Sequence, residues 1–137
     1  MRLYRKFGQG VAVLCCIAMF VLAIAYFFVH GFSEVDKESG EIIYFFEYND
    51  FQGALLVALS FLVSAVANAC TVEFPQIATG IAALPLVMTF YEMAMGNLNA
   101  VAAAVVLLLA LIHLVSNALE WYDMYQTKKK AKKEAAE

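Results

Sequence analysis

Basic residues are almost missing from the interior of this 137-residue chain. Lys37 is the one Lys or Arg between Lys6 and Lys128. Charged residues make up only 15% of the sequence and hydrophobic residues 64%, whereas soluble domains are about half apolar. This imbalance excludes an ordinary soluble domain, and we expect no nucleic-acid partner.

Motifs for common chemistry are absent too. The sequence contains no glycine-rich phosphate loop, no zinc-ligand spacing and no Ser-His-Asp constellation. Adjacent cysteines on a helix point about 100° apart, so Cys15 and Cys16 do not form a chelating pair, and with Cys70 they are interpreted as small apolar residues. We therefore expect no metal and no cofactor. We also expect no enzyme, because no nucleophile has a base beside it.

Four apolar stretches occupy most of the chain and predict helices at about residues 7–32, 51–71, 74–95 and 98–125. Each is long enough to cross the ~30 Å hydrocarbon core, which needs about 20 residues. The first is too long for a signal-peptide core of about 7–15 residues and lacks a small-x-small cleavage site after it. The sequence predicts an all-α integral membrane protein, a four-helix bundle forming one domain over residues 1–137.

Positive charge gathers at the two ends of the sequence. The residues are Arg2, Arg5, Lys6, Lys128, Lys129, Lys130, Lys132 and Lys133. The positive-inside rule then predicts that both termini are cytoplasmic, with a basic tail at 126–137. Compact connections favour a bacterial inner (plasma) membrane.

The connection between the first two helices is short, acidic and aromatic, and it is expected on the outer side. Its 41–46 segment is rich in β-branched and aromatic residues, which suits a short strand paired with 35–37. The same aromatic side chains also suit an interfacial belt. We favour the belt, with a hairpin built into it.

The later connections hold only a few residues, so helices 2, 3 and 4 are predicted to be sequential antiparallel neighbours. Pro75 is suited to the first turn of a helix, and Gly96 to a helix end. Pro85, in the middle of the third stretch, removes one backbone hydrogen bond.

Ser60, Ser64 and Asn68 form an i, i+4, i+8 stripe on the second helix. Small polar residues at this spacing allow close helix packing and hydrogen bonds between helices. A helix-packing seam is the favoured interpretation. A polar conduction path is the alternative, and it requires facing partners.

His113, Asn117 and Glu120 share one face of the fourth helix, at i, i+4 and i+7. An ionisable residue inside a membrane span is a default candidate for function, and histidine titrates near neutral pH. Antiparallel helices place Asn68 at a similar depth, so a cluster of His113, Asn117, Asn68 and Ser64 is predicted. It serves either as a hydrogen-bond network that holds the bundle or as a proton or ion relay.

Glu92 lies near the outer end of the third helix, one turn before Gly96. It is a candidate outer gate and a candidate partner for His30. The favoured interpretation is that its side chain reaches water from the interface.

Two functional hypotheses follow. The first is a non-catalytic subunit, scaffold or interaction partner in the lipid bilayer, which packs against another protein or itself through helices 2 and 4. The second is a small homo-oligomeric transporter or channel, with a path lined by the polar cluster around His113.

Overall fold

The computed structural model describes residues 3–136, so Arg2 and the last residue of the predicted tail lie outside the described part. The elements are α1 (Leu3–His30), β1 (Ser33–Val35), β2 (Ile42–Tyr44), the 3-10 turn η1 (Phe45–Glu47), α2 (Asn49–Cys70), α3 (Pro75–Ala94) and α4 (Ala100–Ala136). Each of the four α-helices is long and apolar enough to cross a membrane. The predicted helical architecture with four such helices is confirmed.

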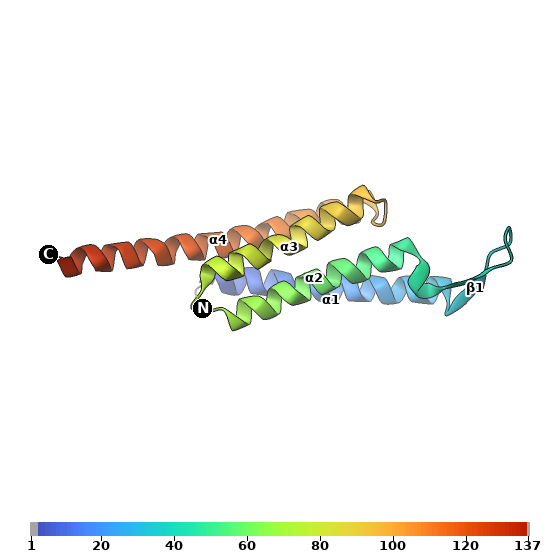
Figure 1. Cartoon of the computed structure of the whole chain (residues 1–137), viewed down its shortest axis with the longest axis horizontal. Helices are drawn as coiled ribbons and strands as arrows, with labels where there is room; N and C mark the ends of the chain where they lie inside the picture. The colour runs from blue at the N-terminus through green and yellow to red at the C-terminus, as the bar shows by residue number, and fades with distance from the viewer. Residues whose placement is uncertain (1–2, 137) are drawn as a thin grey trace.

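The helices form a closed ring in which each packs against two others. α1 contacts α2 and α4, and α3 contacts the same two helices. The start of α1, the α2–α3 turn and the free end of α4 lie at one end of the bundle, called the inner end below (Figure 1). The hairpin between α1 and α2 and the α3–α4 turn lie at the opposite, outer end.

Glycine and proline define three helix ends. Gly31 has φ +73° and its N–H donates to Phe27 O, a left-handed cap that ends α1. Gly96 has φ +77°, and the bonds from Gly96 N to Met93 O and from Asn97 N to Glu92 O form a Schellman motif after α3. Pro75 begins α3, where a missing N–H costs nothing.

The outer connection contains both a hairpin and an aromatic cluster. β1 and β2 pair antiparallel, with Glu34 opposite Ile43. Phe45 contacts Phe27, Phe32 and Phe51, whose rings belong to α1, the linker after it and α2. The aromatic residues therefore hold the hairpin against the helix ends, while the strands themselves are mostly exposed.

The centre of the bundle is packed with small apolar residues and a few larger ones. The most buried include Ala12, Met19, Ala54, Val57, Phe61, Ala103 and Ala110. α3 continues through Pro85, which is itself buried. Large apolar side chains such as Leu14, Leu62, Val87 and Leu108 are exposed along the outside, the arrangement expected of helices that face lipid.

Two helix boundaries differ from the predicted ones for a physical reason. α1 begins at Leu3 rather than near residue 7, because its first turn is packed against α2 and α4 through Arg5. α4 continues to Ala136, through most of the segment predicted as a basic tail. Figure 1 shows this part of α4 extending beyond the inner ends of the other helices.

Candidate functional site

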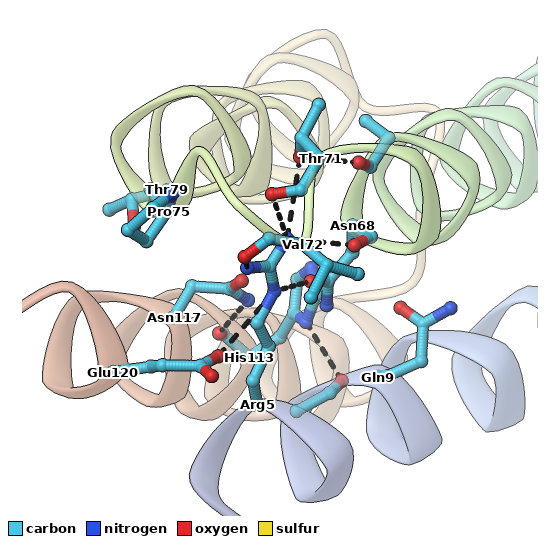
Figure 2. A network of polar contacts seen from close by, with 12 residues as sticks. Arg5, Gln9, Asn68, Thr71, Val72, Pro75, Thr79, His113, Asn117 and Glu120 are labelled. Atoms are coloured by element: carbon cyan, nitrogen blue, oxygen red, sulfur yellow. Dashed lines mark hydrogen bonds and ion pairs between the residues drawn. The ribbon is translucent and has the colours of Figure 1, made fainter. Parts of the chain in front are cut away.

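Arg5 is the centre of a polar network at the inner end, and its side chain is fully buried. Its guanidinium donates to three backbone carbonyls at the end of α2: Asn68 O at 2.7 Å, Thr71 O at 2.7 Å and Val72 O at 2.9 Å. Arg5 Nε also donates to Asn68 Oδ1. Figure 2 shows these bonds converging on the guanidinium.

This arrangement caps a helix. The last carbonyls of an α-helix have no partner within the helix and carry the negative end of its dipole. Arginine offers five N–H donors in a planar fork, which suits several carbonyls at once. Glu120 Oε2 of α4 lies 3.5 Å from Arg5 Nε and supplies a buried negative charge. Arg5 thus joins the start of α1, the end of α2 and α4.

His113 connects the same three helices one turn deeper in the bundle. Its Nδ1 lies 2.8 Å from Gly8 O of α1, and its Nε2 lies 2.6 Å from Ser64 Oγ of α2. A backbone carbonyl only accepts, so Nδ1 carries the proton. In the neutral ring Nε2 then accepts the hydroxyl proton of Ser64.

Gly8 makes this contact geometrically feasible. A Cβ at position 8 would lie 2.8 Å from Ser116 Cβ and 3.4 Å from His113 O. The missing side chain lets α1 approach α4 closely enough for its carbonyl to accept from the imidazole. Close backbone approach at a small residue is the usual way helices pack in a membrane.

The Ser64–His113 pair contradicts one argument made from the sequence. We expected no nucleophile with a base beside it, and this was wrong: Ser64 Oγ lies within hydrogen-bond distance of His113 Nε2. The two side chains are 2% and 0% exposed, so no substrate atom reaches the hydroxyl in this conformation. The pair connects α2 to α4 and offers no open reaction site.

Amide side chains complete the inner network. Asn117 Nδ2 donates to His113 O of its own helix at 3.0 Å, and Gln9 Nε2 donates to Ala65 O of α2 at 2.9 Å. Among residues 3–136, Gln9 Oε1, Asn68 Nδ2 and Asn117 Oδ1 have no hydrogen-bond partner. The predicted cluster is therefore brought together with unequal roles: Ser64 and His113 bond directly, Asn68 bonds to Arg5, and Asn117 stays on its own helix.

The stripe on α2 is buried along its whole length, as a packing seam requires. Ser60, Ser64 and Asn68 are all nearly inaccessible. Ser60 Oγ donates to Val57 O within α2 at 2.6 Å, so it makes no bond to another helix. Within this stripe, the described bonds to other helices are made by Ser64 and Asn68.

Glu92 belongs to a separate group at the outer end. Its carboxylate is 1% exposed and accepts from Asn97 Nδ2 at 2.6 Å. The expectation that it reaches water is wrong, because the Schellman turn after α3 folds Asn97 over it. It does not pair with His30 either, whose Nε2 lies 3.0 Å from Asp50 Oδ2.

An apolar layer separates the two polar groups. It contains Val57 and Phe61 of α2, Val106 and Ala110 of α4, and Met19 of α1. Ser60 lies between Val57 and Phe61 on α2, and its hydroxyl donates within its own helix. Within the described part of the chain, no chain of polar contacts joins the inner network to Glu92.

Sequence reasoning missed four members of the inner network. Arg5 was interpreted as a cytoplasmic flank, and Gln9 and Gly8 were given no role. Glu120 was placed on the face of His113 but left out of the predicted cluster, and it is 2% exposed. One signal was present: Arg5, Gly8 and Gln9 share a helix face by i, i+3, i+4 spacing. Glu120 lies seven residues after His113 and therefore on the same helix face.

The contacts of the network join α1, α2 and α4. No group of three His, Cys, Asp or Glu side chains within residues 3–136 is arranged to hold a metal ion. Comparisons with protein-family models, with curated proteins and with solved structures find no match to the chain. Function is therefore inferred from the geometry of the bundle and its polar groups.

Proposed function

We propose that this chain is an integral membrane protein that acts as a non-catalytic scaffold or subunit, with both ends on the cytoplasmic side. The observation that carries the proposal is the placement of polar groups. In residues 53–68, 80–93 and 101–120, every Ser, Thr, Asn, Glu and His side chain is buried. An outer surface made of apolar side chains suits lipid or another apolar helix.

Charge supports the proposed orientation. Arg5 and Lys6 lie at the inner end, and the lysines of α4 follow beyond it. The hairpin at the outer end carries acidic residues such as Glu34, Asp36 and Glu38. Basic segments remain in the cytoplasm. The proposed location is a plasma membrane, of the bacterial inner-membrane type that compact connections favour.

The transporter alternative has less support. A path through one bundle requires a polar route, and the layer around Phe61 and Ala110 interrupts it. A path between copies requires polar side chains on the outer faces, where the described helices present apolar ones. The inner network instead has its strongest donors engaged by backbone carbonyls, as in a structural joint.

The test is native mass spectrometry of the protein extracted gently from its own host membrane. We expect a stoichiometric complex with at least one different membrane protein. Purified protein in liposomes is expected to show no proton flux above protein-free vesicles at any pH, and His113→Ala is expected to leave that result unchanged. A homo-oligomer without a partner, together with flux that His113→Ala abolishes, would establish the transporter alternative instead.

A further inference from the structure

The end of α4 is an arm that extends beyond the other helices. Residues 121–136 continue the helix past the inner ends of α1, α2 and α3 (Figure 1), and every residue from 125 to 136 is exposed. At ~1.5 Å per residue the arm is about 24 Å long. A helix of this length gains little from propensity alone, so a packing partner is the expected source of its stability.

The base of the arm has the geometry of a helix-packing hole. A hollow there is lined by Ala118, Trp121, Tyr122 and Tyr125, which are the i, i+3, i+4 and i+7 positions of one helix face. Four residues at this spacing form the hole into which a side chain from a facing helix inserts. Ala118 provides a small floor, and the aromatic residues provide walls that are 45%, 61% and 57% exposed.

The tip of the arm is strongly basic. It carries Lys128, Lys129, Lys130, Lys132 and Lys133, with Glu134 as the one acid among residues 124–136. The hollow is therefore followed along the same helix by concentrated positive charge. A docking partner therefore has to fit the hollow first and then the positive charge further along the helix.

A second copy of the chain does not match. Two copies inserted in the same orientation would place their arms parallel, with five lysines against five lysines. Like charges facing each other across an interface cost several kcal/mol. The charge pattern thus acts against self-pairing along the arm.

A lipid surface also fits poorly. α4 runs on in line with its apolar part, away from the bundle. The lysines then lie about 10–18 Å beyond Trp121 at ~1.5 Å per residue. Electrostatic attraction to headgroups decays over about 8 Å at physiological salt. An arm that bound lipid would have to bend toward the membrane surface at a kink that α4 does not have.

We propose that the arm docks a helix of a different membrane protein, which leaves the bilayer parallel to α4. This helix places an apolar side chain in the Ala118–Tyr125 hollow and an acidic segment beside Lys128–Lys133. The proposal rests on the scaffold function above and names the partner's chemistry. Attraction between the two charged segments orients the pair, while the filled hollow supplies the apolar contact.

The experiment is photo-crosslinking in native host membranes, with benzoylphenylalanine at position 125 and, as the matched control, at position 127. Position 127 lies about 200° around the helix from Tyr125, on the opposite face. We expect position 125 to give one product with a different membrane protein. The crosslinked peptide should lie at the end of an apolar helix and precede an acidic segment, and position 127 should give little product.

Two variants test whether the crosslink at position 125 depends on the hollow and the lysines rather than on general association of the two proteins. Ala118→Trp fills the hollow, and Lys129→Glu with Lys133→Glu reverses charge on one side of the arm. Each is expected to lower the yield from position 125 about tenfold or more, because mismatched charge and lost packing act directly on this contact. Ala118 is partly exposed, and circular dichroism checks that both variants keep the bundle's helical content.

The remaining outcomes overturn the proposal. They are a product with a second copy, lipid adducts alone, equal products from both positions, and no product at all. A heteromeric complex in the native mass spectrum without a crosslink at 125 would remove the docking site and leave the scaffold function standing. A homo-oligomer in both measurements, together with flux that His113→Ala abolishes, would remove both.

Discussion

The two ends of the bundle are held together in different ways. At the inner end, side chains bond to backbone carbonyls of distant helices: Arg5 to α2 across 63–67 residues of sequence, and His113 to Gly8 across 105. At the outer end, the polar bonds are local. Glu92 bonds to Asn97 five residues later, and His30 to Asp50 across one connection.

This difference predicts where the bundle is fixed. Moving any one of the three helices breaks bonds to both of the others, so we expect the inner end to be the more rigid end of the bundle. Bonds within a cap or a loop survive movement of neighbouring helices. The proposed arm continues from the rigid end, which suits an element that presents a surface to a partner.

The largest effect is expected at Arg5. Arg5→Met leaves Glu120 without its cation in a buried site and removes the cap from α2, and breaking a buried pair costs about 3–5 kcal/mol. The measurement is the free energy of unfolding in mixed micelles. Lys6→Met is the matched control, because Lys6 is exposed, and its cost should stay within about 0.5 kcal/mol.

A double variant sharpens this test. Arg5→Met with Glu120→Met replaces both charges by apolar groups, and such replacements are often neutral or stabilising. It should therefore recover part of the loss seen in Arg5→Met alone. A double variant no more stable than the single one would show that capping of α2, rather than the charge pair, carries most of the energy.

The number and the approximate bounds of the helices were predictable from hydropathy. α2 and α3 begin and end within two residues of the predicted 51–71 and 74–95. These features depend on local composition and on residues such as Pro75 and Gly96. Each of these residues acts on the turn in which it lies, so a local sequence pattern is enough to predict where the helix begins or ends.

The inner network was predictable only in part. His113, Ser64 and Asn68 were identified because polar residues inside apolar stretches are conspicuous. Arg5 was not, since a basic residue beside a membrane span normally marks the cytoplasmic flank. Its burial depends on carbonyls that the end of α2 exposes about 65 residues later, and no local pattern reveals such a match.

Two close contacts at glycines, one at each end of the bundle, test the difference between the ends. Gly8→Ala puts a Cβ 2.8 Å from Ser116 Cβ, and Gly53→Ala puts one 2.6 Å from Asn97 O at the outer end. Each is expected to cost about 1–3 kcal/mol, as overpacking does. Gly8→Ala should be the worse of the two, since Ser116 is fixed in α4 while Asn97 lies in a turn.

Controls for this comparison are two exposed glycines in α1 and α3. Gly10 and Gly80 have open space where a Cβ would go. Gly10→Ala and Gly80→Ala should stabilise their helices by up to about 1 kcal/mol through helix propensity. Thermal unfolding of the four variants orders them. If Gly53→Ala loses more than Gly8→Ala, the outer turn is the more rigid end and the comparison reverses.

A smaller effect is expected from single hydroxyl groups on α2. Ser64→Ala removes the bond to His113 Nε2 and should cost about 0.6 kcal/mol, the average for such bonds between membrane helices. Ser60→Ala removes only a bond within α2 and should cost less. Equal losses from the two variants would mean that the Ser64–His113 bond adds nothing specific to the inner end.

The smallest effect concerns Tyr48 in the outer connection, where its ring stacks on His30 at a centroid distance of 3.7 Å. The Tyr48 hydroxyl donates to Glu34 Oε2 at 2.6 Å, and this bond raises the pKa of Tyr48 from 10.0 to about 12. A raised pKa in the folded state means that the contact stabilises the hairpin fully below pH 10. The stabilisation is then lost as the pH rises through about 12.

The measurement is a ¹³C NMR titration of the tyrosine ring carbons, with Tyr48 assigned by Tyr48→Phe. Glu34→Gln is the informative variant, because an uncharged acceptor should bring the Tyr48 pKa back toward its ordinary value. The inner network contains no tyrosine, so helix signals from that end should stay constant over the same pH range. A concurrent change there would show that the two ends are coupled, and the hairpin would then be part of the joint rather than an independent outer element.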